Sequence, residues 1–429
     1  METMLETESR PAAATVQADT SDFAERIRAD FPVFERRIAG KTIAFFDGPG
    51  GSQVPRQVAD AVSGYLTLHN ANVHGRFALS AETDAILAEA RQAAADFVNG
   101  APDEIVFGAN MTTLTFHLAR SLGRAWGPGD EVIVTELDHQ ANVAPWRRMA
   151  ADTGMTVRIL PLDRERMQLD YAALDSLLSE RTRLVAIGAA SNAVGTINDV
   201  RRVADAAHAA GALVFADAVH YAPHELVDVA ELGCDFLACS SYKFFGPHAG
   251  ILWGRRELLG RFEPYKVPPA TDAVPERWET GTQNHEAIAG IRAAIDWIAS
   301  IAGEGAGGRR DALRRAYEQV DAHEQALFAL LEDGLRTIPG VRVHGVERGQ
   351  RRTPTAAFTV DGCTPDDVAR RLGAEGVFVW NGDFYATTVC DALGLSDCGG
   401  LVRAGLAPYT SEDDVRRLIH GVARIASGS

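Results

Sequence analysis

One lysine lies in a stretch where a charged side chain is unusual. The segment SSYKFFGPHAG, residues 240–250, places Lys243 between Ser-Ser-Tyr and two phenylalanines that precede a Gly-Pro turn. Taken alone, such a lysine is most often a surface side chain whose aliphatic stem covers apolar neighbours. It can instead form a covalent bond with an aldehyde. The other reactive residues of the chain decide between these two interpretations.

Several polar side chains follow directly after short apolar runs that are typical of β-strands. In open α/β sheets, ligands bind outside the carboxyl ends of the strands, so residues at these positions are expected to meet at one edge of one sheet. The set comprises Met111 and Thr112 after EIVFGAN, His139 after VIVTELD, Asn192 after VAIGAAS, Asp217 at the end of LVFAD, and Ser240 at the end of FLACS.

This set of residues meets the chemical requirements of pyridoxal 5'-phosphate (PLP). Lys243 would bond to the aldehyde, and Asp217 would keep the ring nitrogen protonated by raising its pKa by about 1 to 3. His139 would stack on the ring. The remaining contacts would be Asn192 and His220 to the phenolic oxygen, with the helix-start amides of Met111 and Thr112 and the hydroxyls of Ser240 and Tyr242 at the phosphate.

Each residue also has an ordinary structural interpretation. Asp217 is explained by a turn, His139 by a hydrogen-bonded loop, and Thr112 by the N-cap of a helix. A metal site formed by His220 and His224 is disfavoured, because Pro223 breaks the helix that would align them. The occurrence of the whole set in chain order at strand ends favours a PLP site without a metal.

The elements that position these residues follow from the pattern between residues 102 and 253, where β-rich runs alternate with helical stretches. This alternation predicts crossover units and a mostly parallel sheet. Segment 199–210, for example, has an Asp at its start, apolar residues on one face and Gly211 as its stop. Beyond the glycine-rich segment 302–310, strand candidates and helices form a smaller unit. We therefore predict an α/β fold, with a large domain and a smaller α+β domain.

The predicted boundaries divide the chain into three parts. Residues 1–20 lack apolar periodicity and are expected to form a disordered tail. Residues 21–295 would form the large PLP-binding domain, and about the first 20 of these residues would pack with the small domain. Residues 296–429 would form the small C-terminal domain.

Composition excludes several classes of partner. The net charge of −16 and a pI near 5.2 disfavour binding to nucleic acid or to an anionic membrane surface. No stretch approaches the ~20 apolar residues of a membrane-spanning helix, and the start of the chain is acidic, unlike a signal peptide. The five cysteines include no C-x-x-C pair, so reduced thiols and a cytoplasmic location are expected.

The motifs around these residues resemble those of the class V aminotransferases of PLP fold type I, in particular the branch of the cysteine desulfurases and selenocysteine lyases. The resemblance extends from about Phe45 to Tyr409. It is carried by FFDGPGGSQVP, NVHGRFALSA, DHQANVAPW, SNAVGTIND, FADAVHYAPH, SSYKFFGPHAG, RWETGTQN and LVRAGLAPY.

The resemblance implies a homodimer and two further site residues. Thr282 of RWETGTQN is expected to reach the phosphate in the neighbouring subunit. Arg403 of LVRAGLAPY is expected to bind the substrate carboxylate, beside Asn192, and a planar guanidinium group suits this bidentate contact.

One region departs from the family pattern. Cysteine desulfurases carry a nucleophilic cysteine after a pair of histidines, shortly before the carboxylate-binding arginine. Here the corresponding stretch VWNGDFYATTVCDALGL has Asp383, Phe384 and Tyr385 instead. Cys390 follows later, in a predicted helix where we expect a small buried apolar residue rather than a nucleophile. Two smaller departures are His220 in place of glutamine and Tyr242 in place of histidine.

The sequence thus predicts a PLP-dependent enzyme with the C–S or C–Se lyase chemistry of a cysteine desulfurase or selenocysteine lyase. An isopenicillin N epimerase-like isomerase or an aminotransferase would use the same cofactor residues and need no cysteine. A non-enzymatic scaffold would have little reason to keep Lys243 and Arg403. A dehydrogenase is disfavoured because no G-x-G-x-x-G follows a strand.

Overall fold

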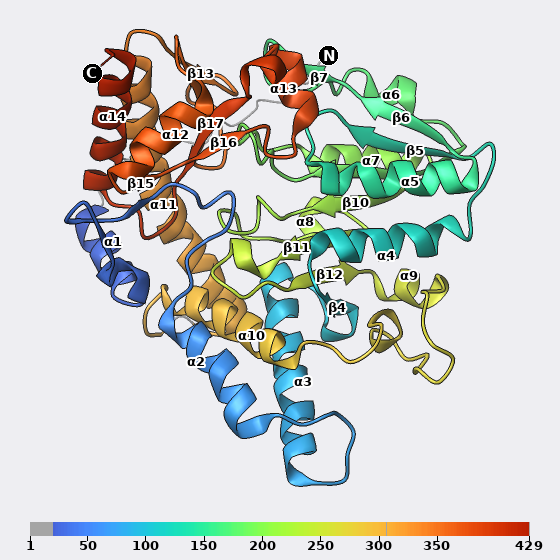
Figure 1. Cartoon of the computed structure of the whole chain (residues 1–429). Helices are drawn as coiled ribbons and strands as arrows, with labels where there is room; N and C mark the ends of the chain where they lie inside the picture. Colours follow the sequence, from blue (N-terminus) through green and yellow to red (C-terminus); the bar gives the residue numbers. More distant parts are fainter. Residues whose placement is uncertain (1–19, 306, 429) are drawn as a thin grey trace, which may run out of the picture.

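The computed structural model describes residues 20–305 and 307–428 (Figure 1). Residues 1–19 of the predicted tail lie outside the described residues. The largest element is a seven-stranded sheet in the order β4-β12-β11-β10-β9-β5-β6. Strand β12 is antiparallel to both of its neighbours, and all other pairs are parallel, which confirms the predicted mostly parallel sheet. The strands are β4 (Ile105–Gly108), β5 (Glu131–Thr135), β6 (Thr156–Leu160), β9 (Thr182–Gly188), β10 (Leu213–Asp217), β11 (Phe236–Ser240) and β12 (Gly250–Gly254).

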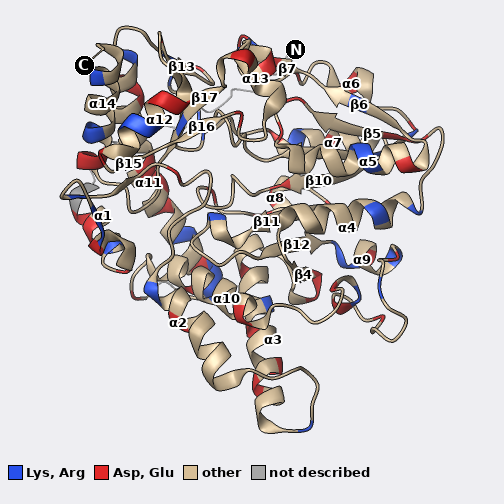
Figure 2. Cartoon of the chain, in the orientation of Figure 1, with Lys and Arg blue, Asp and Glu red and all other residues tan. Residues whose placement is uncertain are grey.

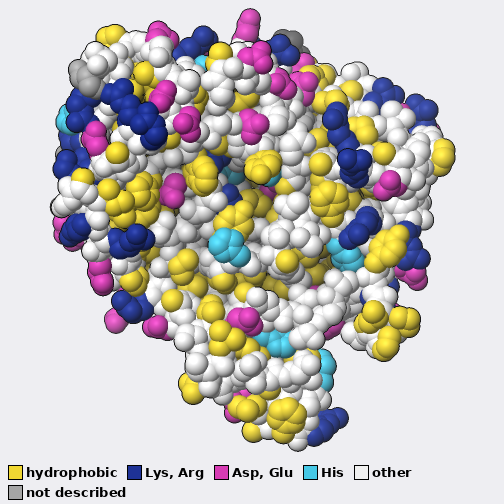
Figure 3. Space-filling view, viewed as in Figure 1, with side chains coloured by type: hydrophobic (Ala, Val, Ile, Leu, Met, Phe, Trp, Pro, Cys, Tyr) yellow, Lys and Arg dark blue, Asp and Glu magenta, His cyan; other side chains and the backbone are white. Residues whose placement is uncertain are grey.

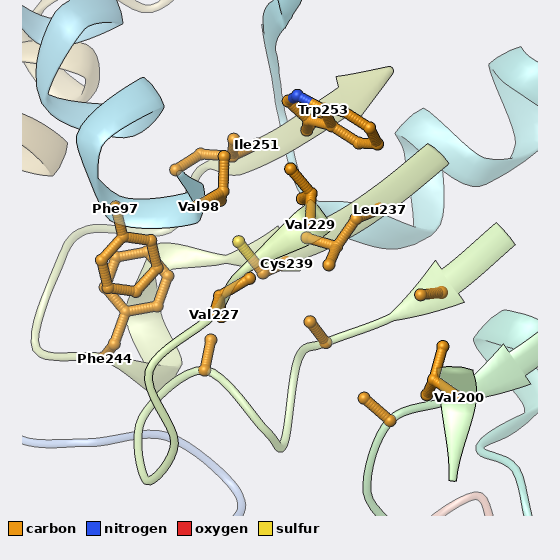
Figure 4. Close-up of a cluster of buried hydrophobic side chains, with 14 of the residues drawn as sticks. Phe97, Val98, Val200, Val227, Val229, Leu237, Cys239, Phe244, Ile251 and Trp253 are labelled. Atoms are coloured by element: carbon orange, nitrogen blue, oxygen red, sulfur yellow. The ribbon is translucent and has the colours of Figure 1, made fainter. Parts of the chain in front are cut away.

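Both faces of this sheet are buried at its central strands. In β10, Val214 and Ala216 belong to one hydrophobic core and Phe215 to another, as expected for a strand whose side chains alternate between two covered faces. Figure 4 shows part of the first core, where Phe97 lies against Phe244. The helices of this part are α3 (Ala78–Val98), α4 (Met111–Gly123), α5 (Ala144–Thr153), α6 (Leu174–Leu177), α7 (Val200–Ala209), α8 (Val229–Leu232), α9 (Arg256–Arg261) and α10 (His285–Ser300).

Helix α7 shows how local sequence sets these elements. The side chain of Asp199 accepts a hydrogen bond from the backbone N–H of Arg202 (3.0 Å), so it caps the first turn. The apolar residues of its predicted face are buried, and Gly211 follows with φ +78°. The predicted helix over residues 199–210 is therefore confirmed.

A second sheet lies in the C-terminal part of the chain. It is antiparallel, has the order β13-β14-β17-β16 and packs against three helices. Its strands are β13 (Val341–His344), β14 (Thr355–Val360), β16 (Trp380–Gly382) and β17 (Leu401–Gly405), and its helices are α11 (Arg309–Arg336), α12 (Pro365–Ala374) and α14 (Glu412–Ala426). The predicted boundary near residue 295 stays a prediction.

The N-terminal segment contacts this second sheet region. In α1 (Thr20–Arg28), the guanidinium of Arg28 donates to the backbone oxygen of Tyr409 (2.7 Å). Strand β3 (Ala44–Phe45) pairs in parallel with β15 (Val377–Phe378). The remaining short elements are β1 (Arg37–Ile38), β2 (Lys41–Thr42), β7 (Leu162–Asp163), β8 (Gln168–Leu169) and α13 (Thr387–Leu393).

A projection extends from the main body at α2 (Arg56–Gly64) and the start of α3 (Figure 1). Figure 3 shows hydrophobic side chains at its tip, and the exposed ones are Leu66, Leu68, Phe77 and Leu79. Figure 2 shows basic residues interspersed with acidic ones, without a continuous basic face in this view. Among the described helices, none combines the length and apolarity that are needed to cross a bilayer.

Candidate active site

The strand ends of the large sheet open into one cavity of about 790 Å³. This volume is typical of a small-molecule site, for which roughly 300–1,000 Å³ is usual. Ten of the eleven predicted site residues line it: Met111, Thr112, His139, Asn192, Asp217, His220, Ser240, Tyr242, Lys243 and Arg403. The eleventh, Thr282, is exposed and is not among the lining residues of its own chain. We call the residues at the strand ends and at the start of α4 the floor, and residues 380–387 the roof.

Lys243 lies in a short 3-10 turn that follows β11. Its Nζ donates to the backbone oxygen of Pro49 and lies 5.0 Å from the centre of the Tyr242 ring. Burial lowers the Lys243 pKa from 10.5 to about 7; the charge of Arg403 lowers it further, and that of Asp217 opposes the shift. A large fraction of this amine is therefore neutral at neutral pH, the form that attacks a carbonyl carbon.

Asp217 ends β10 and is 8 % exposed. One carboxylate oxygen accepts the backbone N–H of Val219 (2.9 Å). Burial raises the Asp217 pKa to about 7, and the charge of Asp138 acts in the same direction; the charge of Lys243 opposes the shift, but no Lys or Arg among the described residues is close enough to form an ion pair with Asp217. A protonated ring nitrogen would supply the missing cation, so this carboxylate fits the cofactor that the sequence predicts.

His139 follows β5 and starts a 3-10 turn, where its Nδ1 accepts the backbone N–H of Ala141 (2.9 Å). In the neutral ring, Nε2 therefore carries the proton. Burial, and then the charges of Lys243 and Arg403, lower the His139 pKa to about 4. The side chain is thus a neutral flat ring, as expected for a group that stacks on a cofactor.

Asp138, which sequence reasoning missed, holds two strand ends together. Its carboxylate accepts the backbone N–H of Gly188 at the end of β9 (2.9 Å) and the Asn142 amide (2.8 Å). Burial raises its pKa to about 6. Its position beside His139, directly after a buried strand, was the signal that could have identified it.

The start of α4 and the end of β11 form the predicted phosphate region. The Met111 backbone N–H donates to Ser240 Oγ (2.9 Å), so this amide already has a partner within the chain. A Cβ at Gly250 would lie 2.5 Å from the backbone of Asn110, so only glycine lets β12 pass so close to the helix start. Tyr242 stacks on His248, another lining residue that the sequence did not reveal (ring centres 4.9 Å apart).

His220 faces two threonines of the C-terminal part. Its Nε2 lies 3.1 Å from the hydroxyl groups of both Thr353 and Thr355. His224 does not join His220 in binding a metal ion, because the Nδ1 of His224 is paired with Glu324 (2.9 Å). The described residues contain no group of three or more His, Cys, Asp or Glu side chains arranged to hold a metal ion.

Arg403 of β17 reaches the cavity from the second sheet and is 4 % exposed. Its Nη1 donates to the backbone oxygen of Asn192 (2.7 Å), while its buried Nε has no hydrogen-bond partner among the described residues. Nε and Nη2 form one edge of the guanidinium group, so a two-pronged donor edge is available for a carboxylate. Burial lowers the Arg403 pKa to about 9, although Asp47 opposes this shift.

The roof covers these groups, and two of its residues have a backbone conformation that residues other than glycine seldom adopt. Phe384 and Tyr385 both have φ +56°, which costs of order 1–3 kcal/mol for each non-glycine residue. The contacts that hold them are the Asn192 amide to the Phe384 oxygen (2.8 Å) and the Gln140 N–H to the Tyr385 oxygen (2.8 Å). The sequence identified this segment as unusual but did not show that it lines the cavity.

All five cysteines lie in the described part of the chain, and none of them lines the cavity. Cys390 lies in α13 with its side chain fully buried, as predicted. Burial raises its pKa to about 11, and the nearby charges of Asp383 and Asp391 act in the same direction. Its thiol is therefore protonated at neutral pH.

The sequence of this chain resembles that of known proteins over most of its length. The sequence pattern of the family "Aminotransferase class-V" matches residues 44–418. A cysteine desulfurase of Pectobacterium atrosepticum is 34% identical, with 94% of this chain and 97% of that protein covered. A probable cysteine desulfurase of Streptomyces coelicolor is 32% identical, with coverages of 94% and 96%.

Two solved structures of cysteine desulfurases have a fold similar to that of this chain. An apo cysteine desulfurase from Thermococcus onnurineus superimposes with a TM-score of 0.84 at 28% identity, covering 94% of this chain and 98% of that one. The cysteine desulfurase CsdA of Escherichia coli, in an S-sulfonic acid form, gives 0.82 at 29% identity, with the same coverages. The chain therefore belongs to the aminotransferase class-V family and is an enzyme similar to its cysteine desulfurases.

Proposed function

We propose that the protein is a PLP-dependent enzyme that acts on an α-amino acid with C–S or C–Se lyase chemistry, and that it uses no thiol of its own as sulfur acceptor. One observation carries the proposal. Lys243, Asp217, His139 and Arg403 line one cavity, and no cysteine lines it in the described structure.

The floor residues would hold the cofactor. Lys243 would bond to its aldehyde, Asp217 would face the ring nitrogen, His139 would cover the ring, and Asn192 and His220 would face the phenolic oxygen. When bound, PLP supplies an electron sink that acidifies the α-carbon of an amino acid. The phosphate would be bound by Met111, Thr112, Ser240 and Tyr242, with Thr282 of a second copy.

The side chains of the protein would position the substrate and move its proton. Arg403 would grip the α-carboxylate through its free Nε edge. The Lys243 amine, with a pKa near 7, would take up and return a proton at the α-carbon. The roof would exclude water from this exchange. Since no thiol of the chain reaches the site, sulfur or selenium would leave towards an acceptor from solution.

The lack of a thiol in the cavity also supports a second candidate, an epimerase or aminotransferase, because neither reaction needs one. The deciding experiment incubates the PLP-loaded protein with a panel of amino acids that includes cysteine, cysteine sulfinate and selenocysteine. Alanine, or sulfide released together with pyruvate and ammonia, identifies a lyase. A keto acid that keeps the substrate side chain identifies an aminotransferase, and inverted stereochemistry identifies an epimerase. A protein that binds no PLP and forms no product would be a scaffold.

We further propose a homodimer located in the cytoplasm. The exposed position of Thr282, outside the cavity of its own chain, supports a role in a neighbouring site. The free cysteines suit a reducing compartment. Light scattering measures the oligomeric state, and a Thr282→Ala variant that binds PLP as tightly as the unchanged protein would contradict the role of Thr282.

A further inference from the structure

Phe384 in the roof contacts both of the groups that are expected to bind the substrate. Its ring covers one face of the Arg403 guanidinium group, with the central carbon 4.1 Å from the ring centre. Its backbone oxygen accepts the Asn192 side-chain amide (2.8 Å). The ring therefore lies directly beside the donor edge of Arg403 that remains free.

The Phe384 ring is held at this place by the contacts of its neighbour in the chain. Tyr385, the next residue, has its N–H bonded to Asp383 Oδ1 (2.9 Å) and its oxygen to the Gln140 N–H (2.8 Å). The Tyr385 ring also lies 5.4 Å from that of His139. These contacts connect the roof to the floor, so Phe384 is a fixed part of the cavity wall.

The wall around Arg403 is aromatic and contains few cations. Trp380, Phe384 and Tyr385 all line the cavity. Within the described part of the chain, Lys243 and Arg403 are the only lysine or arginine residues that line it, and Asp383 adds a negative charge in the roof. With Arg403 and Lys243 engaged by the carboxylate and the cofactor, the described lining residues offer no further lysine or arginine to an anionic substrate side chain.

The covalent structure of an amino acid brings its side chain next to this wall. The side chain begins two bonds from the carboxylate carbon, so a substrate anchored at Arg403 has its β-carbon and following atoms within reach of the Phe384 ring. Aromatic rings favour apolar and aromatic groups, and offset or edge-to-face contacts add to the effect of burial. Thioether sulfur also makes favourable contacts with rings.

We propose that Phe384 is a specificity-determining residue that favours α-amino acids with an uncharged side chain able to pack on an aromatic ring. The inference rests on the proposed function, because it takes Arg403 as the carboxylate anchor. An S-substituted cysteine with an apolar substituent combines this preference with a C–S bond that a lyase can break.

The test uses carboxylates that lack the amino group and so cannot react. Calorimetry on the PLP-loaded protein measures the dissociation constants of 3-phenylpropionate, propionate and succinate, which match phenylalanine, alanine and aspartate in shape. We expect 3-phenylpropionate to bind at least about tenfold more tightly than succinate. In Phe384→Ala, its dissociation constant should rise about tenfold, while that of propionate should change less than about threefold.

Two further variants serve as controls for the Phe384→Ala measurement. Phe384→Leu retains apolar bulk without the ring and should give an intermediate value, which guards against a folding defect in the alanine variant. Phe77→Ala removes an exposed phenylalanine that does not line the cavity and should change nothing. Retained PLP and an unchanged circular dichroism spectrum show that each variant is folded.

The outcomes separate this inference from the proposed function. Equal affinities for 3-phenylpropionate and succinate, tighter binding of 3-phenylpropionate by Phe384→Ala, or no binding of any probe would overturn the role of Phe384. The proposed function is judged independently, by whether the amino-acid panel yields a product.

Discussion

The floor of the cavity comes from the seven-stranded sheet, whereas the roof begins with β16 of the four-stranded sheet. The floor holds the residues that we propose to bind PLP. The roof lacks the cysteine that a desulfurase carries near this arginine, and it places Phe384 on Arg403 instead. We therefore expect cofactor binding to depend on the floor, and the reaction and the choice of substrate to depend on the roof. Substitutions in the floor should therefore impair cofactor binding or turnover, and substitutions in the roof should change the choice of substrate.

The largest effect is expected in the floor, from Lys243→Ala. No other amine lines the cavity in the described structure, so covalent attachment of the cofactor should be lost completely, and turnover with it. Borohydride reduction of the PLP-loaded protein, followed by peptide mass analysis, locates the attachment site. A label on any lysine other than Lys243 would refute the assignment.

Asp217→Asn should keep the cofactor but lower turnover by about 10²- to 10³-fold, because an amide cannot hold the ring nitrogen protonated. The measurement is the rate with saturating substrate, together with the absorbance of bound PLP. Asp138→Asn serves as the comparison, since Asp138 is also buried at a strand end but pairs with backbone and amide groups. Near-unchanged turnover in Asp217→Asn would remove this residue from its role.

Arg403→Lys tests the residue that contacts both Asn192 of the floor and Phe384 of the roof. We expect the KM of the substrate to rise about 10- to 100-fold although the charge is retained, because an ammonium group cannot offer a two-pronged edge or cover the Phe384 ring in the same way. Steady-state kinetics would show the change in KM with a smaller change in kcat. If KM is unchanged for every amino acid, another group binds the carboxylate.

The rate of covalent PLP attachment to the apo-protein should follow the neutral fraction of Lys243. Because burial lowers this pKa to about 7, the rate should fall about tenfold per pH unit below 7 and level off above about 8. An ordinary lysine would still gain rate up to about pH 10. Stopped-flow absorbance measures the profile, with free N-acetyl-lysine as control. A rate that continues to rise above pH 9 would show that Lys243 is unperturbed.

The smallest effect is expected from Cys390→Ala. The thiol is buried, and its pKa is raised to about 11, so the variant should keep its activity on the true substrate within about twofold. Cysteine itself should be a poor sulfur donor. Cys398→Ala, at an exposed cysteine, is the matched control. A stable persulfide on Cys390, with loss of alanine production in the variant, would instead identify a desulfurase whose nucleophile has moved.

Local sequence patterns determined the fold and the floor of the site. Helix α7 was predictable because its cap, apolar face and terminal glycine are all set by neighbouring residues. Lys243, Asp217 and His139 could be assigned to one site because the carboxyl ends of parallel strands share one edge of a sheet, whatever the rest of the chain does. Their types then predicted PLP as the cofactor.

The contact between the roof and Arg403 depends on the tertiary structure. Phe384 and Arg403 are brought together by the pairing of β16 with β17 and by two consecutive left-handed residues, which no local propensity predicts for Phe and Tyr. The shifted pKa values of Lys243 and Asp217 depend on burial by distant segments. Position along the chain identifies the reactive groups, but their ionisation and their neighbours depend on contacts between residues far apart in sequence.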